Sequence, residues 1–75
     1  MTWNHIAGLV WTAQSPDGTT YLLTLAGNVS TARWVLWTSE GGGYTIDTWS
    51  ALRAGVDCAL RMAAIKIIDY VGERA

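Results

Sequence analysis

Ser15-Pro16-Asp17-Gly18-Thr19 separates two runs of strand-forming residues, 6–14 and 20–26. Proline presets the first central position of a turn, aspartate suits the second, and glycine takes the left-handed position. This order is typical of a three-residue hairpin loop that ends in a G1 bulge. Because the turn fixes the register, the large apolar residues of both runs fall on one face of an antiparallel pair. The predicted partners on that face are Ala13 with Tyr21, Trp11 with Leu23, and Leu9 with Leu25.

A third strand is predicted at 33–39, after a second turn that contains glycine, asparagine and serine. This strand is apolar on both faces, with Trp34 and Leu36 on one and Val35 and Trp37 on the other. The pattern does not decide which pair packs against the helix, so both arrangements stay open. Strands that are apolar on both faces are usually buried on both faces. In either arrangement, one tryptophan lies on the far face of the sheet.

A long helix is predicted over about 49–71, after a glycine-rich connector and a cap at Thr48 or Asp47. Gly72 is a suitable stop for it. Apolar residues recur in this segment at three- and four-residue spacing, as one buried stripe requires. The sequence therefore predicts one α+β domain over 1–75, with a three-stranded antiparallel β-meander followed by one long C-terminal helix (β-β-β-α).

The composition predicts a chain that buries part of itself against another copy. Apolar residues make up 51% of the 75 residues and charged residues 15%, where an average domain has about 25% charged residues. Domains this small commonly gain stability from disulfides, metals or oligomerisation. One cysteine excludes a disulfide within the chain, and one histidine with scattered acids gives no metal or cofactor site. We therefore expect a homo-oligomer, a dimer or larger. The predicted interface residues are Val10, Leu22, Cys58, Met62, Ile65 and Ile68.

The charge pattern argues against several partners. The net charge is −1, and the five cationic residues are spread along the chain. Duplex nucleic acid and anionic membrane surfaces both require clustered basic residues, so we expect neither as a partner. No apolar run approaches the roughly 20 residues of a membrane helix, and the N-terminus has no signal-peptide pattern. The expected location is the cytoplasm.

Catalytic candidates are few. His5 is the single histidine, and a general base needs an oriented partner and a nucleophile that no spacing here supplies. Cys58 lies in the predicted helix without a neighbouring histidine, where a buried and inert thiol is the usual case. We therefore expect that the protein is not an enzyme.

Aromatic residues gather around the third predicted strand and the connector that follows it. A nucleotide-like ligand could stack on these rings while an arginine meets its phosphate. The residues predicted for such a site are Arg33, Trp34, Trp37, Tyr44 and Trp49. The same rings could instead form the core and the contact between copies, because aromatic residues dominate interface energetics.

Gly43-Tyr44, leading into Thr48-Trp49-Ser50-Ala51-Leu52, resembles antitoxin domains of the HicB type. Those domains have a glycine-rich approach and then a helix opened by serine or threonine. The resemblance rests also on the predicted β-β-β-α order, and it covers the last predicted strand and the helix start. The family's function is not carried over.

The tryptophan-rich strands, the Ser-Pro-Asp-Gly-Thr-Thr turn, the alanine-rich helix and the Gly-Glu-Arg-Ala end resemble short accessory proteins of bacteriophages, particularly those of actinobacteria. This resemblance implies a protein of the host cytoplasm. Some small phage proteins inhibit host defence, including oligomers that sequester nucleotide signals.

Three functional hypotheses follow from these patterns. The first is a small, non-catalytic, homo-oligomeric phage accessory or anti-defence protein that sequesters a nucleotide-like ligand at a subunit interface. The second is an inhibitor or antitoxin-like interaction module that binds a host protein and has no small-molecule pocket. The third is a single-stranded nucleic-acid binder that stacks bases on the sheet, although the chain has few cations for it.

Overall fold

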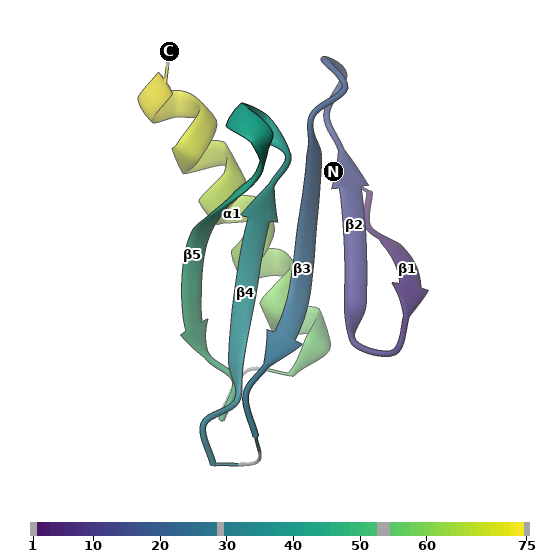
Figure 1. The fold of residues 1–75 in the computed structure, drawn as a ribbon, viewed down its shortest axis with the longest axis vertical. Coiled ribbons are helices and arrows are strands. Elements are labelled where there is room, and N and C mark those ends of the chain that lie inside the picture. Colours follow the sequence, from purple (N-terminus) through teal and green to yellow (C-terminus); the bar gives the residue numbers. More distant parts are fainter. Residues whose placement is uncertain (1, 29, 53–54, 75) are drawn as a thin grey trace.

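The computed structural model describes residues 2–28, 30–52 and 55–74. In these residues five strands form one antiparallel sheet, each paired with the next along the chain, and one α-helix lies against one face (Figure 1). The elements are β1 (Asn4–Ala7), β2 (Val10–Gln14), β3 (Thr20–Ala26), β4 (Arg33–Thr38), the 3-10 turn η1 (Glu40–Gly42), β5 (Tyr44–Ser50) and α1 (Val56–Arg74).

The prediction of a three-stranded meander is wrong, because the sheet has five strands. One extra strand arises where the predicted first strand, 6–14, is divided by a turn at Gly8, whose φ is 47°. This left-handed conformation suits glycine, and it lets β1 and β2 form their own hairpin, in which His5 pairs with Trp11. Leu9 lies in the turn and is 45% exposed. The predicted pair of Leu9 with Leu25 therefore does not form.

The other extra strand occupies the stretch that was predicted to cap and begin the helix. β5 is rich in β-branched and aromatic residues, which favour strands, and it pairs with β4 from Tyr44 to Ser50. The helix consequently begins at Val56 instead of about residue 49, and it continues to Arg74, beyond the predicted end at 71. The chain is still an α+β domain, with two strands more than the sequence indicated.

The β2–β3 hairpin confirms the prediction made from its turn. Ala13 pairs with Tyr21 and Trp11 pairs with Leu23. The backbone N–H of Ser15 donates to the Thr19 carbonyl at 3.0 Å, and Gly18 has a φ of 90°. The Asp17 side chain also accepts the Thr19 N–H at 2.9 Å, as aspartate does in turns of this kind.

The core lies between the sheet and α1. Trp34 and Leu36 of β4 face the helix and are 2% and 0% exposed, which decides the alternative that the sequence left open. Val35 and Trp37 therefore lie on the opposite face, because successive strand residues alternate. The helix contributes small residues and one isoleucine to this core, which lets its backbone approach the sheet closely. The buried helix residues are Ala59, Ala63 and Ile67.

The opposite side of the sheet, called the open face below, has no element of the described chain over it. Figure 1 is viewed from this side, with α1 behind the sheet. Its apolar residues are half-buried among one another, with threonines between them. The pairing of β2, β3 and β4 places Val10, Leu22, Val35 and Trp37 here, next to Thr12 and Thr24. Within the described residues, no helix has the length and apolar character needed to cross a membrane.

Candidate functional site

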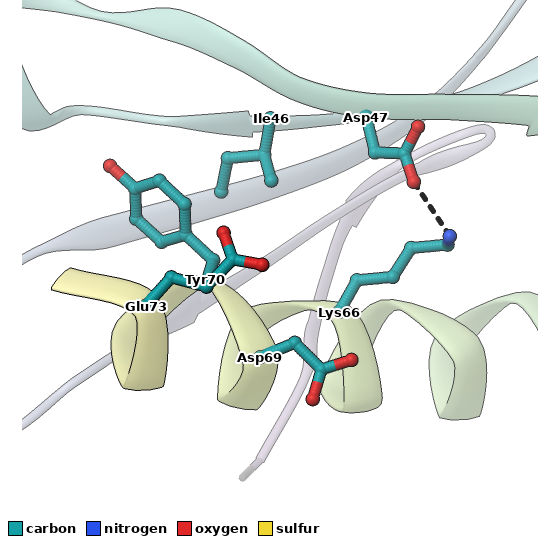
Figure 2. Close-up of a pocket in the computed structure, with 6 residues that line it drawn as sticks. All are labelled: Ile46, Asp47, Lys66, Asp69, Tyr70 and Glu73. Atoms are coloured by element: carbon teal, nitrogen blue, oxygen red, sulfur yellow. Dashed lines mark hydrogen bonds and ion pairs between the residues drawn. The ribbon is translucent and has the colours of Figure 1, made fainter.

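A groove of about 310 Å³ lies between β5 and the C-terminal half of α1 (Figure 2). The strand supplies Ile46 and Asp47, and the helix supplies four residues spaced so that they share one side. β5 carries one extra residue at this point, because Leu36 pairs with Asp47 while Trp37 pairs with Thr45. A bulge of this kind bends a strand and re-aims its side chains. The helix residues of the groove are Lys66, Asp69, Tyr70 and Glu73.

An ion pair crosses the groove. Lys66 Nζ lies 2.6 Å from Asp47 Oδ2 and 5.0 Å from the centre of the Trp49 ring. Asp47 Oδ1 accepts the backbone N–H of Thr48 at 2.8 Å. The hydrogen bond from Lys66 is the largest cause that lowers the pKa of the Asp47 carboxyl from its usual 3.8, and the Thr48 N–H acts in the same direction. Asp47 is therefore ionised and held in one orientation.

A second set of hydrogen bonds connects the N-terminal end of β5 to the last turns of α1. The Tyr70 hydroxyl donates to Glu40 Oε2 at 2.8 Å. It also contacts the hydroxyl of Tyr44, whose ring packs edge-on against that of Tyr70 at 6.1 Å. Since the Tyr70 proton goes to Glu40, the Tyr44 hydroxyl is the donor to Tyr70. The end of the groove is thus fixed by contacts between η1, β5 and α1.

The charge of the groove is negative. Its lining holds three carboxylates, those of Asp47, Asp69 and Glu73, against the single ammonium of Lys66. Lys66 is already engaged by Asp47, while Asp69 and Glu73 are exposed to solvent. Such a lining favours an ammonium or guanidinium group over an anion. Within the described residues, no three His, Cys, Asp or Glu side chains come close enough together to hold a metal ion.

The five residues predicted to bind a ligand do not come together in one chain. Trp34 is in the core, and its cross-strand neighbour Trp49 is half-buried on the same side of the sheet. Tyr44 is the first residue of β5, the outer strand, and its ring packs against Tyr70 of α1. Arg33 and Trp37 lie on the open face, two strand residues on either side of Val35. Within this set, Arg33 and Trp37 share the face of the sheet that α1 does not cover.

The six predicted interface residues also fall into two groups. Val10 and Leu22 lie on the open face. The other four lie on α1, where Ile65 and Ile68 are 60% and 69% exposed. These groups are on opposite sides of the molecule, so one flat contact cannot use both. The remaining helix members are Met62, which is half-buried, and Cys58, which is exposed.

The groove was not predicted from the sequence. Lys66, Tyr70 and Glu73 recur at helical spacing, which was a usable sign of a polar side of the helix. Their partner Asp47 was interpreted as a helix cap, so nothing in the sequence joined it to Lys66, 19 positions away.

No family model matches this chain, and comparisons with curated proteins and with solved structures gave no match either. What the surfaces can do is therefore inferred from their own residues.

Proposed function

We propose that the protein is a small, non-catalytic binding module that works as a homo-oligomer, with the open face as the contact between copies. The observation that carries this proposal is the group of Val10, Leu22, Val35 and Trp37 on the side of the sheet that α1 does not cover. Contiguous apolar surface of this kind marks an interaction site on small proteins. Two such faces pack as in a β-sandwich, with the sheets about 10 Å apart.

Trp37 is the anchor of this contact. Its indole lies against the α-carbon of Gly43, where an added β-carbon would come within 2.4 Å of Trp37 Cζ2. The ring is therefore held by its neighbours before any partner arrives, so binding costs little side-chain entropy. Tryptophan is one of the residues that most often dominates the binding energy of an interface.

The chemistry of the open face suits a second copy. Its central residues are uncharged, and Arg33 lies at its edge with Nη2 donating to Thr48 Oγ1 at 3.2 Å. Two identical faces of this kind meet without like-charge repulsion at their centres. A two-fold contact, in which the same patch serves both chains, is the commonest form of homo-oligomer.

Light scattering after size-exclusion chromatography tests the proposal. The wild type is expected to be a dimer or larger, and Trp37→Thr is expected to shift it to a monomer with an unchanged circular dichroism spectrum. Ile68→Thr is the matched control, because it makes a similar change on the exposed side of α1. A monomeric wild type contradicts the proposal. Dissociation by Ile68→Thr but not by Trp37→Thr would place the contact on the helix.

A nucleotide-like ligand is a second candidate function, favoured by one observation. Arg33 and Trp37 are on the same face of β4, so a contact between copies would bring two charged and two stacking groups together. Thermal-shift measurements with cyclic nucleotides test this candidate against Arg33→Gln and Trp37→Thr. It is rejected if no nucleotide raises the melting temperature of the wild type.

A further inference from the structure

The outer side of β5 is a free edge of the sheet. β5 is the last strand in the order β1-β2-β3-β4-β5, and no described strand pairs with its other side. Ala51 N donates to the Ala32 carbonyl at 2.9 Å. In an antiparallel pair, every second residue directs its N–H and C=O to the partner strand. Ala51 and Trp49 direct theirs toward β4, so those of Thr48 and Ser50 point away from it. The edge contains neither lysine nor proline, two residues that commonly protect edges from pairing.

Part of this edge is already occupied. The Thr48 N–H donates to Asp47 Oδ1, and the bulge at Ile46 interrupts regular backbone pairing in the N-terminal half of the strand. Within the described residues, no hydrogen bond uses the Thr48 carbonyl or the N–H and C=O of Ser50, so these groups can pair with an added strand. Both residues are exposed. Backbone pairing is therefore directed to the C-terminal half of β5, and a segment paired there continues along the strand past Asp47 and Ile46, which line the groove.

The groove adds a charge preference to the edge. An added strand lies about 4.8 Å from β5 and turns every second side chain toward the helix side of the sheet. The last turns of α1 reach past the outer strand on that side (Figure 1). They carry Asp69 and Glu73, which line the groove and are exposed (Figure 2). The negative end of the helix dipole lies at these same turns.

We propose that β5 and this groove bind an extended segment of another protein that carries arginine or lysine. The segment pairs its backbone with Thr48 and Ser50. Where it continues past Asp47 and Ile46, a cationic side chain reaches the carboxylates of Asp69 and Glu73. This surface is at the edge of the sheet, so the proposal goes beyond the homo-oligomer of the open face and does not depend on it.

A second copy of the chain does not suit this edge. β5 itself has no basic residue to offer to the groove. Charge complementarity therefore selects a basic partner over the chain's own copy.

The test uses a short synthetic peptide in which arginine alternates with threonine. Amide chemical shifts of the full chain are followed as the peptide is added at low ionic strength. The expected result is binding that shifts the amides of Thr48 and Ser50. The double variant Asp69→Asn/Glu73→Gln is expected to weaken binding about fivefold, since exposed charge pairs each contribute modestly. Asp57→Asn, which removes an exposed acid at the other end of α1, is the matched control and should bind as the wild type does.

Two altered peptides separate backbone pairing from simple attraction. One replaces arginine with glutamate, and the other replaces threonine with proline, which cannot donate to a strand. Neither is expected to bind. The proposal is overturned if the arginine peptide does not bind, if the proline peptide binds equally well, or if the double variant has wild-type affinity. It is also overturned if the shifted amides lie on the open face, or if β5 pairs with a second copy.

Discussion

The α-carbon of Gly43 lies against the indole of Trp37, and no other residue could stand there without moving the ring. A β-carbon at Gly43 would be 2.4 Å from Cζ2 and 3.1 Å from Cε2 of that ring. Gly43 also has a φ of 103°, a conformation that side-chain-bearing residues rarely adopt. The turn that leads into β5 and the anchor of the open face therefore depend on the same glycine.

Gly43→Ala is expected to lower the free energy of unfolding by about 3 kcal/mol, because backbone strain and overpacking each cost about 1–3 kcal/mol. Urea denaturation measures the loss. Gly42→Ala is the matched control, since Gly42 has a similar φ of 89° but open space around its α-carbon. It should cost only the strain, about 1–2 kcal/mol. Equal losses in the two variants would show that the contact with Trp37 is unimportant for stability.

Two neighbouring leucines of β3 test which face of the sheet is the core. Leu23 is fully buried against the helix, whereas Leu22 is half-buried on the open face. Leu23→Ala is expected to cost about 2–5 kcal/mol, as for a buried leucine. Leu22→Ala is expected to cost about 1 kcal/mol or less in dilute solution, since less of its surface is removed from water. Thermal and urea denaturation at low protein concentration make the comparison. A larger loss for Leu22 would reverse the assignment of the two faces.

The sequence predicted the β2–β3 hairpin well because its information is local. The turn at Pro16, Asp17 and Gly18 fixes the register, and the paired residues lie within a few positions of it. The sequence could not show whether Trp34 or Trp37 faces the helix. Both faces of β4 are apolar, and alternation alone does not tell which face a helix covers. That decision depends on contacts with α1, far along the chain.

β5 was missed because two patterns overlap in it. Trp49 and Leu52 continue the three- and four-residue spacing of the helix, and Asp47 and Thr48 are good capping residues. The strand forms because Tyr44–Ser50 can pair with β4, a long-range contact that a local pattern does not contain. The groove could not be predicted either, because the position of Asp47 opposite Lys66 requires both the strand and its bulge.

The Lys66–Asp47 pair makes a pH-dependent contribution to stability. The folded-state pKa of Asp47 is below the unfolded value of about 3.8, so the contribution is complete above that pH and disappears as the pH falls through the folded pKa. Its size is limited to about 1 kcal/mol or less, since the side chains of Lys66 and Asp47 are 29% and 45% exposed.

Asp47→Asn is therefore expected to be less stable than the wild type at neutral pH and equally stable in strong acid. Urea denaturation of both proteins across this range measures the difference, which should shrink with added salt because the pair is reached by solvent. The asparagine oxygen can still accept the Thr48 N–H, so the change isolates the charge. Asp69→Asn, a control in the same groove, leaves the pair intact and should not reproduce this pH dependence. A stability difference that persisted below the folded pKa of Asp47 would mean that the carboxylate acts through packing and not through its charge.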